Sequence, residues 1–195
     1  SVGVSNEGYQ PRLLYQARWI IAIYVLLTAL CAALLRTVGG MGWLDAVCQA
    51  FAALATGGFC TKTSVADFHS LGAEIVLSTF MYVAGCSFTM LAGVLRDGWK
   101  GARALFRTGE FRIYTLFTVL AVGFVTVDLM RGGLGFGMAL RQSSFNTISM
   151  LTCCGLANAD FQAWPPLSLI VLFTCMMVGG CSGSAAGGMK QVSKL

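Results

Sequence analysis

Apolar residues along this chain gather in four long runs, separated by polar or glycine-rich stretches. The runs cover residues 13–35, 71–95, 113–130 and 167–189, and glycines interrupt the last of them near its end. An α-helix needs roughly 20 apolar residues to cross the hydrocarbon core of a bilayer. We therefore predict four membrane-spanning helices, of which the fourth is broken.

Two further apolar runs are too short to cross. Residues 44–55 and 139–151 have the length of a re-entrant or buried segment, about 10–14 residues. The first runs into the turn ATGGFC (55–60), and the second runs into TCCGLA (152–157). The pattern predicts two half-length helices that enter the membrane and turn back.

The chain repeats this arrangement. Gly58 and Gly155 are 97 positions apart, and MYVAGCS (81–87) matches MMVGGCS (176–182) at a shift of 95. Because these two matches have nearly the same spacing along the chain, they indicate a duplicated unit. We predict an all-α membrane protein with two tandem pore repeats, each a span, a re-entrant half-helix, a Gly-rich filter turn and a second span. The predicted repeats are residues 1–107 and 108–195.

Composition favours a membrane location. The chain is 56% hydrophobic and 11% charged, with a mean hydropathy of +0.74, whereas soluble domains carry about a quarter charged residues. A net charge of +5 would suggest nucleic acid as the partner of a soluble protein. Here the basic residues lie in loops between apolar runs, so we expect contact with membrane lipid and not with nucleic acid.

The basic residues also predict an orientation. Nine of the thirteen lysines and arginines fall on one side of the predicted membrane: Arg12, Arg18, Arg96, Lys100, Arg103, Arg107, Arg112, Lys190 and Lys194. Loops on the cytoplasmic side carry an excess of such residues. We expect a multi-pass plasma-membrane protein with both ends of this segment in the cytoplasm and both half-helices entering from outside.

Cysteine usage gives no sign of a metal centre. The eight cysteines lie mostly within apolar runs, and the single histidine is His69. CxxC pairs and other zinc-ligand spacings are absent from the sequence. We expect small buried thiols and no covalently bound cofactor.

The two turns have the composition of an ion-coordinating backbone. A pore must replace the water shell of an ion with oxygens, and backbone carbonyls do this where the chain turns them inward. Glycine permits the backbone angles and the close approach that this requires. The candidate ion-binding residues are Ala55, Thr56, Gly57 and Gly58 in the first turn, and Thr152, Cys153, Cys154 and Gly155 in the second.

These motifs resemble those of the TrkH/TrkG/KtrB potassium transporter family. ATGGFC (55–60) is similar to the second filter of that family, and TCCGLA (152–157), followed by Trp164-Pro165, is similar to the third. GGCSGSAAGGMK (179–190) resembles the glycine-rich break in the helix that follows. The resemblance covers essentially the whole chain and implies four repeats around one pore, of which this chain holds the middle two.

The resemblance also implies an ion, a gate and partners. Potassium is the transported ion, and the expected setting is the bacterial inner membrane. The expected partners are the missing pore repeats, a second copy in a homodimer, and a cytoplasmic nucleotide-binding regulatory subunit. The candidate residues of the gating loop are Gly179, Gly180, Ser182, Gly183, Ser184, Gly187 and Gly188.

Two other functions match parts of the sequence. Residues 180–183 fit the GxSG motif of rhomboid intramembrane proteases, but the serine needs a base, and His69 lies in the predicted outer segment. The chain also reads like a piece of a longer protein, and its small-residue clusters favour close helix packing. A non-conducting membrane scaffold is therefore the second alternative.

Overall fold

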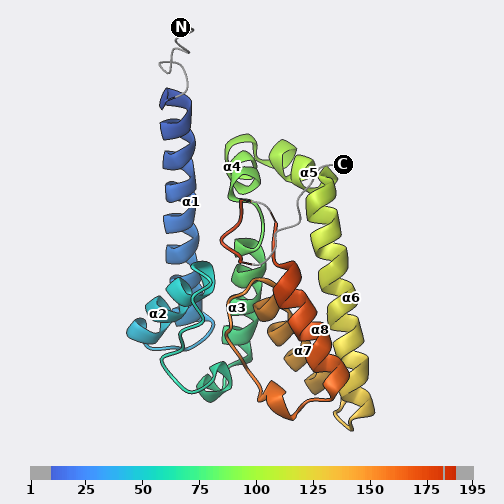
Figure 1. Cartoon of the computed structure of the whole chain (residues 1–195). Helices are drawn as coiled ribbons and strands as arrows, with labels where there is room; N and C mark the ends of the chain where they lie inside the picture. The colour runs from blue at the N-terminus through green and yellow to red at the C-terminus, as the bar shows by residue number, and fades with distance from the viewer. Residues whose placement is uncertain (1–9, 182, 188–195) are drawn as a thin grey trace, which may run out of the picture.

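The structure is a computed structural model that describes residues 10–181 and 183–187. Within these residues the regular structure is helical, and Figure 1 shows the arrangement of the elements. In chain order they are α1 (Gln10–Thr37), α2 (Trp43–Leu54), η2 (Val65–Phe68), α3 (Leu71–Ala84), α4 (Phe88–Asp97), α5 (Trp99–Arg107), α6 (Gly109–Arg131), α7 (Phe136–Leu151), η3 (Phe161–Ala163) and α8 (Pro166–Val178). The order long helix, short helix, 3-10 turn, helix occurs in α1 to α3 and again in α6 to α8.

Two helices are long and apolar enough to cross a membrane. They are Ala17–Thr37, within α1, and α6, with mean hydropathies of 2.2 and 1.9. At about 1.5 Å per residue, each exceeds the ~30 Å thickness of a hydrocarbon core. Many of their large apolar side chains face outward, including Ile21 and Val119, each 62% exposed. Such surfaces suit contact with lipid or with other helices rather than with water.

The two helices that follow the long spans, α2 and α7, pack among the other helices. α2 lies against α1 and α3, whereas α7 lies against α3, α6 and α8. At about 1.5 Å per residue, the 12 residues of α2 and the 16 of α7 reach roughly 18 and 24 Å. Neither length crosses a bilayer core, so each helix ends inside the bundle, where its turn begins.

The second predicted span (71–95) differs from the single helix that was expected. The structure has two helices there, α3 and α4, with a break that begins at Gly85. The Gly85 carbonyl accepts a hydrogen bond from Cys181 N at 2.9 Å, and Phe88 N donates to the Gly183 carbonyl at 3.1 Å. Backbone groups that would continue the helix are instead paired with a segment from the other half of the chain, so the helix stops.

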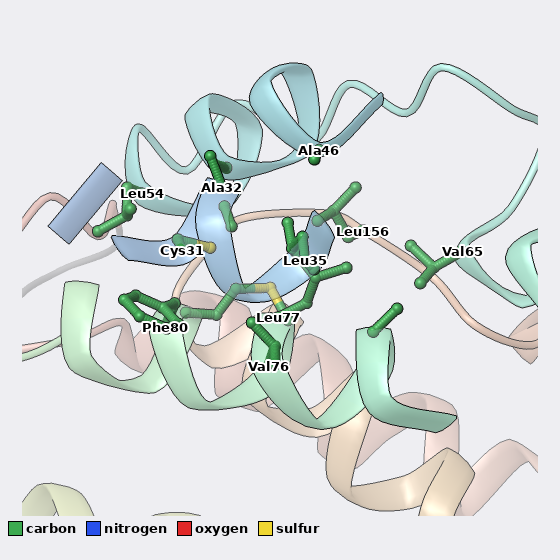
Figure 2. Close-up of a cluster of buried hydrophobic side chains, with 14 of the residues drawn as sticks. Cys31, Ala32, Leu35, Ala46, Leu54, Val65, Val76, Leu77, Phe80 and Leu156 are labelled. Atoms are coloured by element: carbon green, nitrogen blue, oxygen red, sulfur yellow. The ribbon is translucent and has the colours of Figure 1, made fainter. Parts of the chain in front are cut away.

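A buried apolar cluster connects the first half of the chain to the second turn. Leu35 of α1, Leu54 of α2 and Leu77 of α3 meet there, each 0% exposed. Leu156, which follows the second turn, packs into the same cluster (Figure 2). The core of the first half therefore contains a residue of the second half, which fixes the two halves against each other.

A carboxylate joins the C-terminal end of α6 to the N-terminal end of α8. Asp128 Oδ2 accepts hydrogen bonds from Ser168 N at 3.1 Å and from Ser168 Oγ at 2.6 Å. The first turn of a helix has unpaired N–H groups and a positive dipole end, and an acidic side chain satisfies both. This contact fixes the start of α8 against the end of α6.

The connecting segments divide between two ends of the helices. In Figure 1 the start of α1 and helices α4 and α5 lie at one end, and η2 and η3 lie at the other. The exposed residues Lys100, Arg103 and Arg107 belong to α5. The end with this basic connector is the end that the sequence predicts to be cytoplasmic.

Candidate functional site

The first candidate turn begins where α2 ends. Ala55 closes the helix in the αR conformation, and Thr56 follows with a positive φ of 50°. Gly57 N donates to the Ala52 carbonyl at 2.9 Å, and Gly58 has a φ of 69°. A hydrogen bond across the last helical turn, followed by left-handed residues, reverses the chain at the C-terminal end of the half-helix.

The second candidate turn repeats this backbone geometry. After α7, Cys153 has a φ of 54° and Gly155 a φ of 84°, and Cys154 N donates to the Ser149 carbonyl at 2.9 Å. Each of these residues stands 97 positions after its counterpart in the first turn. A positive φ is unfavourable for residues other than glycine. Its occurrence at both Thr56 and Cys153 therefore indicates that one backbone shape is imposed twice.

The two turns lie against each other. A Cβ atom placed on Gly58 would overlap the carbonyl oxygen of Cys154 and would stand 3.5 Å from the Cα of Gly155. The Cys154 thiol also donates to the Ala52 carbonyl at 3.4 Å. The structure thus brings together candidate residues from both halves of the chain. Position 58 requires glycine because of this close approach as well as its positive φ.

The segments that leave the turns are also paired. The Ala157 carbonyl accepts hydrogen bonds from Val65 N and from Ser64 Oγ, both at 2.9 Å. Ser64 caps η2 as well, since its side chain accepts from Ala66 N. The exit of the second turn is therefore held by the segment that follows the first.

Backbone oxygen is the available ligand at this place. Both half-helices direct their C-terminal ends at the turns, and the C-terminal end of a helix carries a negative potential. Among the described residues, no group of three His, Cys, Asp or Glu side chains is placed to hold a metal ion. Backbone carbonyl oxygens in general can replace the water shell of an ion where the chain turns them toward it.

Residues 179–187, hereafter the glycine loop, follow the end of α8. Gly179 and Gly183 have positive φ values of 72° and 73°. Ala185 N donates to the Ala84 carbonyl at 3.2 Å, beside the bond between Cys181 and Gly85. The glycine loop therefore fills the break between α3 and α4. Two of the predicted gating residues, Ser182 and Gly188, lie outside the described residues.

The glycine loop contacts both turns. The Thr56 hydroxyl donates to the Ala185 carbonyl at 3.1 Å. A Cβ atom on Gly187 would stand 3.3 Å from the Cβ of Cys153. Ser184 bonds within the loop, to the Cys181 carbonyl at 2.6 Å. In the hydrogen bond between turn and loop, the donor is therefore the hydroxyl of Thr56 in the turn, and the acceptor is a backbone carbonyl of the loop.

A charged network beside the second turn was not among the predicted site residues. Arg141 on α7 donates two hydrogen bonds to the Glu74 carboxylate on α3, from Nε to Oε2 at 2.8 Å and from Nη2 to Oε1 at 2.7 Å. Asn158 Nδ2 also donates to Glu74 Oε2, at 2.8 Å. The sequence did contain a signal for this network, since Arg141 lies within a short apolar helix and a charge at such a place needs a partner.

The histidine and the GxSG motif lie at opposite ends of α3. His69 precedes α3, whereas Cys181 and Gly183 bond to Gly85 and Phe88 beyond its other end. The 14 residues of α3 extend about 21 Å at the usual helical rise. A general base must lie within hydrogen-bond reach of its nucleophile. Ser182 itself lies outside the described residues, and its neighbours Cys181 and Gly183 stand about one length of α3 from His69.

These features define an α-helical protein of membrane character, with two long apolar helices and two shorter helices whose C-terminal turns meet. The chain belongs to the TrkH family, whose model is described as a cation transport protein and matches residues 9–195.

Several relatives resemble the chain over almost its whole length. The Trk system potassium uptake protein TrkH of Halomonas elongata is 33% identical over 191 residues, 97% of this chain and 39% of that protein. TrkI of the same organism is 35% identical over 188 residues, 95% of this chain and 37% of that protein. The crystal structure of the potassium transporter TrkH from Vibrio parahaemolyticus has a TM-score of 0.87 at 29% identity, covering 92% of this chain and 39% of that one. The chain thus spans 37–39% of the length of these relatives.

Proposed function

We propose that this chain takes part in potassium uptake across the bacterial inner membrane, as two quadrants of a K+-selective pore. Residues 1–107 and 108–195 are two of four pore repeats, with α2 and α7 as re-entrant half-helices. Residues 55–58 and 152–155 form two walls of the selectivity filter. Both ends of the chain and the connector at α5 face the cytoplasm.

One observation carries this proposal: two turns with the same backbone shape meet at the ends of two half-helices. A filter needs equivalent carbonyl-bearing segments around one axis, because each contributes similar oxygens to the same ion. Ordinary connecting turns need not share unfavourable φ values at Thr56 and Cys153, since backbone strain of this kind is maintained where function requires it. The relatives' names, potassium uptake proteins, support potassium as the ion.

The glycine loop serves in this proposal as the gate. It has contacts with both turns, through Ala185 and Gly187, so an ion leaving the turns on that side meets it. Glycine-rich backbone is a poor helix former and changes conformation readily. Three backbone hydrogen bonds between described residues attach the loop to the break after α3, and at about 1 kcal/mol each a modest free energy breaks them.

The pore requires further components. Two turns make up half of a four-part filter, so two more repeats must complete the ring; "complete pore protein" below means this chain together with those repeats. A homodimer of that assembly, surrounded by lipid, and a nucleotide-binding regulatory subunit at the cytoplasmic end are further parts of the proposal.

The test is transport by variants of the complete pore protein. We expect Gly58→Val and Gly155→Val to abolish growth on low potassium in cells without other uptake systems, because side chains there displace the coordinating carbonyls. The matched control is Gly123→Val, at an exposed position of α6 with open space around its Cα. Normal potassium uptake and selectivity in both turn variants would overturn the assignment.

A further inference from the structure

We infer that Glu74, Arg141 and Asn158 form a positioning network that holds the second turn in its ion-coordinating shape. This inference rests on the proposed function and adds to it a set of residues that set selectivity without touching the ion. The network connects α3, in the first half of the chain, to α7 and to the segment that leaves the second turn.

The geometry of the ion pair is specific. The Arg141 guanidinium meets the Glu74 carboxylate with two parallel hydrogen bonds, at 2.8 and 2.7 Å. Such a bidentate pair fixes the relative orientation of both side chains as well as their distance. Because Arg141 belongs to α7 and Glu74 to α3, the pair fixes the half-helix against the first half of the chain.

The network then reaches the turn through two amides. Asn158, three residues after Gly155, donates to Glu74 at 2.8 Å and accepts from Asn146 Nδ2 at 2.7 Å. Asn146 lies on α7, nine positions before Gly155. The turn therefore lies between two residues, Asn146 and Asn158, that are bonded to each other. With its two flanks joined in this way, the turn has little freedom to open.

Burial makes the network costly to form and costly to disrupt. Glu74, Asn158 and Asn146 are 3%, 6% and 0% exposed. The Arg141 side chain is 35% exposed, at a cavity of about 390 Å³ that Asp67 and His69 also line. A buried carboxylate is costly unless it is paired and hydrogen-bonded, as Glu74 is here. Simple packing of α3 on α7 needs no charges, since apolar side chains serve it as well or better.

Within the described part of the chain, the first turn has no such network. The positions 97 residues before Arg141 and Asn158 are Leu44 and Thr61, which provide no charge. Leu44 is 77% exposed and faces away from the bundle. The charged support is therefore a property of the second turn alone, which a general packing requirement would not explain.

The experiment measures the K+ over Na+ permeability ratio of the complete pore protein in liposomes. We expect Glu74→Gln and Arg141→Lys each to lower the ratio about tenfold, the lower end of the effect seen when groups that orient ion ligands are removed. The Arg141→Lys variant keeps the positive charge but loses the two parallel hydrogen bonds of the guanidinium, so it tests whether the orientation of the pair matters. We also expect the Glu74→Gln and Arg141→Lys effects to be strongly non-additive in the double variant.

The matched control is Asp160→Asn. It removes a carboxylate two residues after Asn158, but Asp160 is exposed and its side chain bonds only to Gln162 N among the described residues. We expect its ratio to equal that of the parent. If the K+ over Na+ ratio of Asp160→Asn falls as much as that of the network variants, then the overall charge at the outer side controls selectivity and the inference is wrong.

The remaining outcomes separate this inference from the proposed function. An unchanged ratio in the Glu74 and Arg141 variants, with selectivity lost in Gly155→Val, contradicts the network and leaves the filter assignment standing. An unchanged ratio in all of them contradicts both. If Glu74→Gln and Arg141→Lys both fail to insert in the membrane, the network serves folding, which also contradicts the inference.

Discussion

The two turns share a backbone shape but differ in what supports them. Gln49 and Asn146, 97 positions apart on the two half-helices, are both 0% exposed. Each donates its side-chain amide to the segment after its turn, Gln49 to Cys60 Sγ at 2.9 Å and Asn146 to Asn158 Oδ1 at 2.7 Å. Among the described residues, only the second support continues, through Asn158, into the ion pair of Glu74 with Arg141.

The difference suggests which features ion binding demands. Carbonyl positions depend on the backbone, so both turns keep the same unfavourable φ values. Each side-chain support has only to hold the backbone of its own turn, so different residues support the two turns. The first turn has a hydroxyl contact with the glycine loop, through Thr56, whereas the second has the charged network. We therefore expect gating to act chiefly on the first turn and selectivity to depend chiefly on the supports of the second.

We expect the largest effect in a comparison of ion flux between Gly58→Ala and Gly155→Ala. A Cβ atom at position 58 overlaps the Cys154 carbonyl, whereas one at position 155 meets only the Gly58 Cα, at 4.0 Å. The variant at 155 has only the left-handed backbone penalty, about 1–2 kcal/mol. In rubidium-uptake assays per inserted protein, Gly58→Ala should lose nearly all flux and Gly155→Ala should keep a measurable part. Equal loss in both would show that contact between the turns is unimportant.

A smaller effect is expected from the glycine loop. Deleting Gly183–Gly187 removes the contacts of the loop with both turns, so we expect several-fold higher potassium flux and weaker regulation. Gly183→Val should alter opening, because position 183 has a φ of 73°, and should leave the K+ over Na+ ratio unchanged. Flux recordings with and without the regulatory subunit provide the measurement. A deletion variant that folds, conducts and responds like the parent would identify the loop as packing.

The smallest effect concerns the side-chain hydrogen bond of Thr56 to the glycine loop, the one such bond of the first turn among the described residues. Thr56→Val keeps the shape of the side chain and removes its bond to Ala185. A hydrogen bond contributes about 1 kcal/mol, so the ratio of open to closed pores should rise roughly fivefold. Thr79→Val is the control, since the exposed Thr79 hydroxyl bonds only within its own helix, to Ile75. An equal rise in both variants would attribute the effect to helix stability.

Much of this arrangement was predictable from the sequence. Length separated α2 and α7 from the long helices α1 and α6, because 12 or 16 residues of helix cannot cross a bilayer, but it did not separate them from α3 and α8, which have 14 and 13 residues. Glycine content and the shift of 97 located both turns, since the requirement for a positive φ at residues 58 and 155 restricts side chains there. Local signals of this kind need no knowledge of the rest of the fold.

The parts that were missed depend on contacts between distant residues. The break after α3 exists because residues 181–185 occupy its carbonyls, almost 100 positions along the chain. The match of MYVAGCS to the broken fourth span was a usable signal, because a repeat of the sequence indicates a repeat of the break. The pairing of Glu74 with Arg141 required the packing of α3 on α7, which neither helix specifies alone.

Thallium(I) diffraction on the complete pore protein tests the central claim most directly. Thallium(I) replaces potassium in carbonyl sites and scatters X-rays anomalously, so its position is measured without reference to transport. We predict an anomalous peak bounded by the backbone carbonyls of residues 55–58 and 152–155 and by their counterparts in the other repeats. Thallium bound elsewhere in a protein that conducts potassium, with no peak beside these turns, would contradict the account.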